Sequence, residues 1–272
     1  MVMNIKTTAK LNNGTKIQIL GLGVWQIPNG KVCEEAVLNA LNTGYRHIDT
    51  AAAYKNEESV GNAIRKSNIA RKDIFVTTKL WNDDHDDPKK AFNESLKKIQ
   101  LDYIDLYLMH YPVPERNSSW KILEKIYKSG KAKAIGVSNF TIRHLKELLE
   151  NSDIVPAVNQ VEFHPYLYQK ELLDFCNKNK IKLEAYSPLT HGKKLNDIKL
   201  VEISKKYNKL AAQVLIKWGL QHGLIVIPKS SKKERIIENS SVFDFEISEE
   251  DMERLDEFNE NLRTCWNPTD AP

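Results

Sequence analysis

Residues Tyr45–Tyr54 read Tyr-Arg-His-Ile-Asp-Thr-Ala-Ala-Ala-Tyr, and this stretch begins as a short strand. The strand is predicted over Tyr45–Ile48, and a helix-like segment follows from Asn56. Asp49 therefore lies where the strand ends, and Tyr54 lies in the loop that follows. An acid and a phenol at the carboxyl end of one strand raise the question of which other side chains meet them.

The same alternation of strand and helix runs along most of the chain. Helical periodicity predicts helices over Val32–Asn42, Glu58–Lys66, Pro88–Gln100, Trp120–Lys128, Thr141–Glu150, Gln169–Asn177, Ile198–Tyr207, Ala211–His222 and Ser231–Glu238. Short apolar runs predict eight strands, at Ile19–Leu22, Tyr45–Ile48, Ile74–Thr78, Ile104–Met109, Ala134–Val137, Ala157–Val161, Leu183–Ala185 and Leu224–Ile227. Because these runs are continuous rather than alternating, we expect both faces of the sheet to be covered.

Eight strands with helices between them favour an α/β fold of the (β/α)8 TIM-barrel type, and 272 residues suit its usual length of about 250. An open doubly wound sheet is the alternative. A hairpin with Asn-Gly at its turn is predicted over Ala9–Ile17. The short tail Ser248–Pro272 begins with a capping box of Ser248 and Asp251 and a short helix. No linker or repeat interrupts the pattern, so residues 1–272 are expected to form a single domain.

Composition excludes several classes of protein. A formal charge of +4 is too small for a general polyanion binder, so no nucleic-acid partner is expected. No apolar run is long enough to span a membrane, and no signal peptide is apparent at the start of the chain. The three cysteines match no metal or disulfide spacing. A cytoplasmic location, with no metal and no membrane partner, is the resulting expectation.

Chemistry in such barrels takes place at the carboxyl ends of the strands. Asp49, Tyr54, Lys79 and His110 follow three successive predicted strands and are expected to converge. The ammonium of Lys79 would lower the pKa of Tyr54 from its usual value near 10, and Asp49 would hold Lys79 in place. His110 would donate a hydrogen bond to a carbonyl oxygen. Such a set fits carbonyl reduction, with Tyr54 as the general acid.

Each of these residues also has a purely structural interpretation. Asp49 could cap a turn or pair with Arg46, and Lys79 could be a solvated strand end. His110 and Tyr54 could be packing residues. Perturbed groups cluster at functional sites, so the joint pattern favours catalysis.

The position of a cofactor follows from two further stretches. Gly21–Gly23 comes after a strand, but Gln26 stands where a dinucleotide fingerprint needs its third glycine, which argues against a Rossmann site. Lys229–Ser231 and Arg235 lie after the eighth strand, where barrels often bind phosphate. Two cations and two hydroxyls exceed the needs of one diphosphate and suit an additional phosphate monoester. The alternative is that both cations are solvated surface charges.

The chain resembles the aldo-keto reductase family from about residue 11 to residue 262. The matching stretches are Gly21-Leu-Gly-Val-Trp25, Gly44-Tyr-Arg-His-Ile-Asp-Thr-Ala-Ala-Ala-Tyr54, Thr78-Lys-Leu-Trp81, Leu101-Asp-Tyr-Ile-Asp-Leu106, His110-Tyr-Pro112, Ile135-Gly-Val-Ser-Asn-Phe140, Asn159-Gln-Val-Glu-Phe-His-Pro165, Ala185-Tyr-Ser-Pro-Leu189 and Ile227-Pro-Lys-Ser-Ser231. Together they are highly specific, whereas any one alone would be weak.

The resemblance implies a catalytic tetrad and an NADPH site. The tetrad would be Asp49, Tyr54, Lys79 and His110. Contacts to the nicotinamide carboxamide would come from Ser138, Asn139 and Gln160, and Tyr186 would stack on the ring. Ser187, Leu189 and Lys229 would contact the pyrophosphate and ribose. The 2′-phosphate would be bound by Lys229, Ser230 and Arg235, and the adenine would lie near Glu238 and Asn239.

Differences from the family pattern bear on the substrate. Tyr111 replaces the tryptophan that many relatives have after the tetrad histidine, and two neighbouring loops and the tail are short. The chain is therefore similar to a compact microbial branch that includes 2,5-diketo-gluconate and methylglyoxal-type reductases. The walls of a pocket for a small carbonyl substrate would be Trp25, Trp81, His110, Tyr111 and the tail around Trp266. Trp25 and Trp81 could instead pack a lid.

Two other functions fit parts of the pattern. A Schiff-base aldolase would use Lys79 as its nucleophile, although a lysine beside Asp49 should stay charged. A non-catalytic regulatory subunit would keep the barrel and the NADPH site without turnover. The resemblance implies a monomer or a weak homodimer.

Overall fold

Eight parallel strands lie side by side in chain order in the computed structural model, which describes residues 3–272. They are β3 (Leu22–Gly23), β4 (His47–Asp49), β5 (Phe75–Leu80), β6 (Ile104–Met109), β7 (Ala132–Ser138), β8 (Val158–Glu162), β9 (Lys182–Tyr186) and β10 (Ile225–Val226). The first and last strands meet through hydrogen bonds from Gly21 N to Val226 O and from Val226 N to Ile19 O, at 2.9 and 2.8 Å. The sheet therefore closes, which confirms the predicted (β/α)8 barrel.

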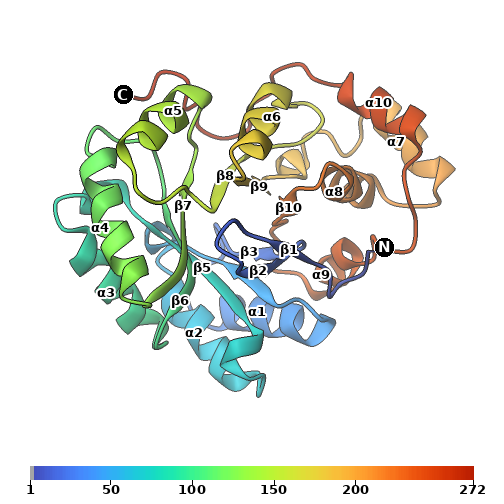
Figure 1. The fold of residues 1–272 in the computed structure, drawn as a ribbon. Helices are drawn as coiled ribbons and strands as arrows, with labels where there is room; N and C mark the ends of the chain where they lie inside the picture. Colours follow the sequence, from blue (N-terminus) through green and yellow to red (C-terminus); the bar gives the residue numbers. More distant parts are fainter. Residues whose placement is uncertain (1–2) are drawn as a thin grey trace.

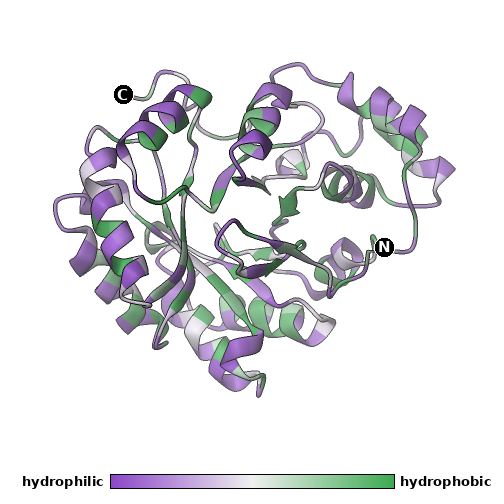
Figure 2. Cartoon of the chain, in the orientation of Figure 1, coloured by the Kyte–Doolittle hydropathy of each residue, from purple (hydrophilic) through white to green (hydrophobic). Residues whose placement is uncertain are grey.

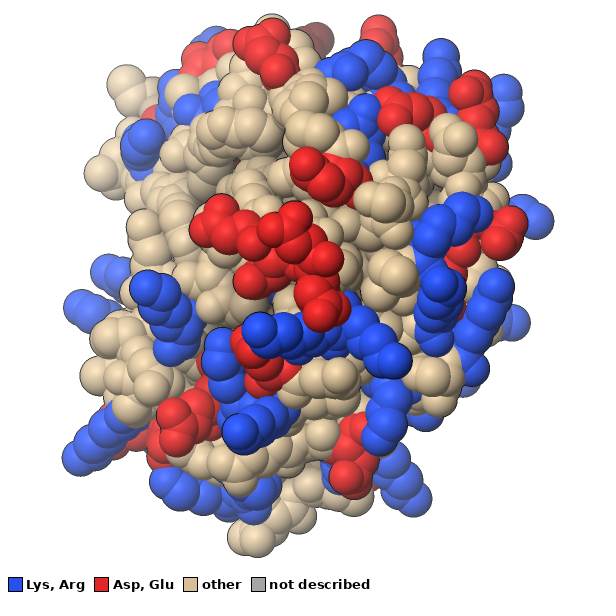
Figure 3. All heavy atoms as spheres, turned by 90° about the vertical axis from the view of Figure 1, so that its left-hand side faces the viewer, with Lys and Arg blue, Asp and Glu red and all other residues tan. Residues whose placement is uncertain are grey.

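Helices surround this barrel, as Figure 1 shows. They are α1 (Lys31–Thr43), α2 (Glu57–Lys66), α3 (Pro88–Ile99), α4 (Arg116–Lys128), α5 (Ile142–Asn151), α6 (Lys170–Lys178), α7 (Ile198–Lys206), α8 (Ala211–Gln221), α9 (Lys233–Ser240) and α10 (Glu249–Asp256). Their apolar faces turn toward the strands and their polar faces outward (Figure 2). Acidic and basic side chains are interspersed over the face that Figure 3 shows. No helix of residues 3–272 has both the length and the apolar character needed to cross a membrane.

The predicted N-terminal hairpin is present as β1 (Thr8–Lys10) and β2 (Lys16–Gln18), paired antiparallel. Its Leu11 and Ile17 are buried in one apolar cluster with Phe75, Leu106, Leu108 and other residues of the strands. The hairpin thus contributes to the apolar core inside the barrel.

Several predicted bounds differ from the structure by a few residues, and α4, for example, begins at Arg116 rather than Trp120. The first two strands show the physical reasons. The ladder of the first strand contains Leu22–Gly23 rather than Ile19–Leu22, because Leu20 makes only an isolated bridge to Val226. The second strand is His47–Asp49, since Tyr45 instead packs in the core and donates to Ile236 O.

The predicted capping box at α10 is only half formed. Ser248 Oγ accepts from Asp251 N at 3.2 Å, as expected. The Asp251 carboxylate, however, binds Lys206 and the Tyr207 hydroxyl, and Ser248 N donates to that hydroxyl at 3.0 Å. Tyr207, the residue that follows α7, therefore supplies the acceptor for Ser248 N that the box would have used.

Gly61 allows α2 and α3 to approach closely. A Cβ at this position would lie 1.9 Å from Ile99 O. Gly61→Ala is therefore expected to destabilise the protein by about 1–3 kcal/mol, although alanine is the better helix former by about 1 kcal/mol. Urea unfolding measures the change. Glu58→Ala, at an exposed position of the same helix, should change stability by less than about 0.5 kcal/mol. Equal effects of the two substitutions would contradict the prediction.

Candidate active site

A buried ion pair lies at the carboxyl ends of β4 and β5. Lys79 Nζ is 2.7 Å from Asp49 Oδ1, and it also donates to Thr50 O at 2.9 Å and to Tyr54 Oη at 3.3 Å. Lys79 is fully buried and Asp49 is 2% exposed. Three of the four predicted tetrad residues are thus joined in the order Asp49, Lys79, Tyr54.

The loop that carries Tyr54 is fixed by Asn56. The Nδ2 of Asn56 donates to Val24 O and to Ile27 O, both at 2.9 Å, and its Oδ1 accepts from Thr50 Oγ1 at 2.7 Å. All polar atoms of the Asn56 side chain therefore hold this loop against the loop after β3. The phenol is placed by a short 3₁₀ turn, Ala52–Tyr54.

The pKa of Tyr54 is shifted opposite to the direction expected from Lys79 alone. Burial, and then the charge of Asp49, raises the pKa of Tyr54 well above its usual value. The expectation of a lowered pKa was wrong, because burial of the phenol, and then the negative charge of Asp49, outweigh the effect of the Lys79 ammonium. Tyr54 therefore keeps its proton. Since Lys79 donates to the phenol oxygen, the hydroxyl hydrogen is free to point into the cavity.

His110 follows β6 and faces the Tyr54 ring, with 5.7 Å between ring centroids. Burial, and then the charge of Lys79, lowers the pKa of His110 well below its usual value. The imidazole is therefore neutral at neutral pH, with one N–H to donate. The edge of the Trp81 ring packs against it at 5.2 Å, which holds the imidazole at the cavity wall.

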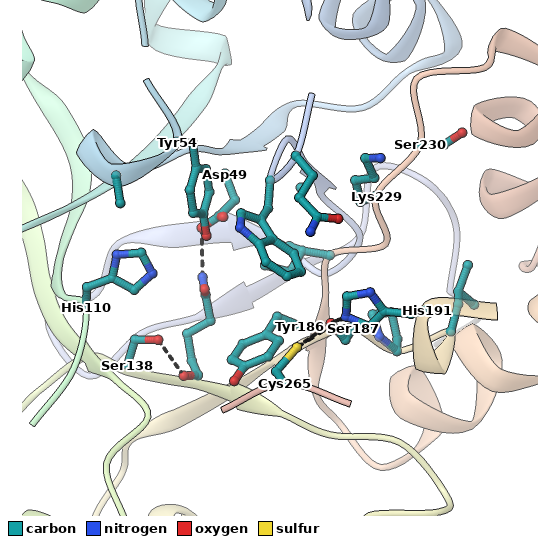
Figure 4. A pocket seen from close by; sticks show the side chains of 18 of the residues that line it. Asp49, Tyr54, His110, Ser138, Tyr186, Ser187, His191, Lys229, Ser230 and Cys265 are labelled. Atoms are coloured by element: carbon teal, nitrogen blue, oxygen red, sulfur yellow. Dashed lines mark hydrogen bonds between the residues drawn. The ribbon is translucent and has the colours of Figure 1, made fainter. Parts of the chain in front are cut away.

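These groups open into a cavity of about 1440 Å³. Figure 4 shows Asp49, Tyr54 and His110 on one side of it and Lys229 and Ser230 on another. A cavity for a single drug-sized ligand measures about 300–1,000 Å³. The observed volume is large enough for a dinucleotide together with a small substrate.

The predicted carboxamide contacts are linked to one another and to Tyr186 by hydrogen bonds. Ser138 Oγ donates to Gln160 O at 2.8 Å, and the Tyr186 hydroxyl donates to Asn139 Oδ1 at 2.7 Å. Asn139 Nδ2 donates to His110 O at 2.9 Å. These bonds cross-link the ends of four strands into one floor of the cavity.

The predicted phosphate contacts line a different part of the cavity, beside α9. This part is formed by Ser187, Leu189, Lys229, Ser230, Arg235, Glu238 and Asn239. Lys229 and Arg235 are exposed, and neither pairs with a carboxylate of residues 3–272. Two unpaired cations near the start of a helix fit a phosphate group.

Aromatic side chains form the predicted substrate walls. The Tyr111 ring stacks on His110 at 4.9 Å between centroids and meets the edge of Trp266 at 4.8 Å. Trp81 lies 6.0 Å from Tyr111. Trp25 is 39% exposed and packs against His191 rather than against this group.

Sequence reasoning missed two contributions to the cavity. Glu162, at the end of β8, accepts hydrogen bonds from Thr264 N at 2.7 Å and from Cys265 N at 3.2 Å, and so holds the tail at the cavity. Glu184, in the middle of β9, is fully buried and contacts Gln160. A glutamate inside an apolar strand was a signal for the second of these.

Comparison with known proteins identifies the family. The sequence model of the aldo/keto reductase family matches residues 19–260. The chain belongs to the aldo/keto reductase family. It is 51% identical to a glyoxal reductase of Bacillus subtilis, over 98% of both chains. It is 45% identical to a methylglyoxal reductase of Escherichia coli, over 96% of this chain and 97% of that one.

Solved structures of this aldo/keto reductase's relatives have the same fold. An aldo-keto reductase from a deep-sea metagenome library matches with a TM-score of 0.93 and 45% identity, over 98% of this chain and all of that one. An aldo-keto reductase of Bombyx mori, solved in complex with NADP, matches with a TM-score of 0.90 and 37% identity, over 98% and 97% of the two chains.

The buried carboxyl of Glu184 should make stability depend on pH. Burial, and then the charge of Asp49, raises the pKa of Glu184 from 4.5 to about 8. The folded protein therefore retains a proton that the unfolded chain releases, so the free energy of unfolding falls as pH rises through this range. Glu184→Gln removes the titration.

We expect the stability of Glu184→Gln relative to wild type to rise by a few kcal/mol between about pH 5 and pH 9, since one pKa unit corresponds to about 1.4 kcal/mol. Urea unfolding of both proteins at each pH measures this difference. A difference that stays constant with pH would contradict it.

Proposed function

We propose that this chain is an NADPH-dependent reductase of small aldehydes and ketones. The observation that carries the proposal is the hydrogen-bonded group of Asp49, Lys79 and Tyr54 at the wall of a dinucleotide-sized cavity. The NADP complex of the Bombyx mori relative and the names of the two bacterial reductases support it.

His110, Tyr54 and Lys79 each have a separate role in the transfer of a proton to the substrate. A bound NADPH would supply the hydride that reduces the carbonyl carbon. The neutral His110 donates a hydrogen bond to the carbonyl oxygen and orients it toward Tyr54. Tyr54 then gives its proton to the developing alkoxide, and the adjacent Lys79 ammonium stabilises the tyrosinate that is left. Protonation of Tyr54 from solvent completes the cycle.

The cavity suggests a substrate class. Tyr111, Trp81 and Trp266 give its substrate end flat apolar walls, and His110 and Tyr54 supply the polar contacts. Together with the relatives that reduce glyoxal and methylglyoxal by name, these walls favour small uncharged aldehydes and α-dicarbonyls. We also propose that the protein works in the cytoplasm as a single domain, as a monomer or weak homodimer.

The geometry disfavours the two alternatives. A Schiff-base aldolase needs a neutral lysine amine, whereas Lys79 is fully buried in an ion pair and directs its hydrogens at three acceptors. A non-catalytic subunit has no need of the buried Asp49–Lys79 pair beside a phenol.

Tyr54→Phe tests the proton donor. The variant keeps the ring and loses the acidic hydrogen, so we expect kcat for methylglyoxal to fall by at least about 100-fold. The dissociation constant of NADPH, measured by quenching of protein fluorescence, should stay within about twofold. Normal turnover by this variant would show that Tyr54 is not the acid.

Arg235→Ala tests the phosphate site. Removing one charge-assisted contact of about 1.5–3 kcal/mol should weaken NADPH binding by roughly 10- to 100-fold and leave NADH binding nearly unchanged. Lys232→Ala, which removes an exposed lysine that does not line the cavity, is the matched control. Equal losses for both cofactors would contradict a 2′-phosphate contact.

A further inference from the structure

Glu184 is a buried carboxyl that the proposed mechanism does not use. It lies on β9 directly opposite Gln160 of β8 in the parallel register. Its Oε1 is 2.5 Å from Gln160 Nε2, and the same nitrogen is 2.7 Å from Asp49 Oδ2. One amide nitrogen therefore bridges the two carboxyl groups.

This bridge determines which way the Gln160 amide faces. An amide nitrogen carries two hydrogens and no acceptor, so two carboxyl oxygens on the same atom use both hydrogens. With the retained proton of Glu184 on its unpartnered Oε2, Glu184 Oε1 is an acceptor like Asp49 Oδ2, and a flipped amide would place its own oxygen against these two acceptors. Gln160 lines the cavity, and both hydrogen bonds that its side chain makes within residues 3–272 are donated by Nε2, not accepted by Oε1. The acceptor end of the amide is therefore available to a ligand.

The hydrogen bond to Asp49 alone would not fix the orientation of the Gln160 amide. A single hydrogen bond restrains one N–H and leaves the amide plane free to turn about that bond. The second contact, to Glu184, fixes the plane. Gln160 is also the one hydrogen-bond partner of the Glu184 side chain in the described chain, because Glu184 Oε2 has none.

Other buried glutamates of this chain have different partners. Glu124, for example, accepts from Asp153 N and Ile154 N, and so supports a loop backbone. Within residues 3–272 the Glu184 side chain makes no hydrogen bond to a backbone group, and its hydrogen bond is to a residue of the cavity wall. Its burial is therefore not explained by a contact that supports the fold.

We propose that Glu184 is a positioning residue for cofactor recognition. It holds the Gln160 amide with its nitrogen on Asp49 and its oxygen toward the cavity, where that oxygen accepts a hydrogen bond from a primary carboxamide. This inference rests on the proposed function, because the carboxamide is that of the nicotinamide of NADPH.

The test compares NADP⁺ with its 3-acetylpyridine analogue, which has a methyl group where the carboxamide has its NH₂. Dissociation constants are measured by quenching of protein fluorescence for wild type, Glu184→Leu and Glu184→Gln. One hydrogen bond corresponds to a preference of roughly 3- to 10-fold, so wild type should prefer NADP⁺ by about that factor. Glu184→Leu should lose the preference. Glu184→Gln should keep it, because its amide oxygen can accept from Gln160.

Two controls separate the proposal from general damage. Binding of 2′,5′-ADP, which lacks the nicotinamide, should be unchanged in every variant. Glu57→Gln alters another buried glutamate, one that accepts from Thr78 Oγ1 and does not line the cavity, and it should keep the preference for NADP⁺. Glu184→Met replaces Glu184→Leu if the latter fails to bind 2′,5′-ADP.

Three outcomes would overturn the proposal. They are a Glu184→Leu variant that keeps the preference, a Glu184→Gln variant that loses it as fully as Glu184→Leu, and a wild type that binds NADP⁺ without any preference. A wild type that binds neither dinucleotide would instead overturn the proposed function, so the two failures are distinguishable.

Discussion

The buried ion pair of Lys79 and Asp49 is the interaction on which the rest of the site depends. Two charges removed from water are costly unless close geometry and further hydrogen bonds compensate them. Here the 2.7 Å contact, the carbonyl of Thr50 and the amide of Gln160 provide that compensation. Loss of either partner would leave an uncompensated charge in the barrel, so Asp49 and Lys79 constrain the residues packed around them.

The pair also explains the behaviour of its neighbours. Burial and the charge of Asp49 together keep Tyr54 protonated despite the nearby Lys79 ammonium, and the hydrogen bond from Lys79 leaves the phenol proton directed at the cavity. Its positive charge adds to the burial that keeps His110 neutral. One pair of charges therefore sets a protonated donor beside an uncharged hydrogen-bond donor, as the reduction of a carbonyl requires.

Much of this arrangement could be predicted because barrel topology converts chain order into spatial order. Polar residues after successive apolar strands lie at one rim of a barrel, and the sequence therefore predicted that Asp49, Lys79 and His110 converge. Contacts within the strands were not predictable in this way. Glu184 lies in the middle of β9, and its contact with Gln160 depends on strand register. The hydrogen bond from Thr264 N to Glu162 joins residues about a hundred positions apart, so no local sequence pattern predicts it.

The sequence by itself determined the barrel, its N-terminal hairpin and which polar residues lie at the rim of the barrel, because apolar periodicity and turn chemistry are local properties. Only the tertiary structure determined the protonation state of Tyr54, the last residue of the stretch Tyr45–Tyr54. Whether Tyr54 is acidic or inert depends on desolvation and on the net charge nearby, and both sum over side chains from several strands. The sequence predicted that Tyr54 is the acid, and the folded structure determined that Tyr54 is protonated.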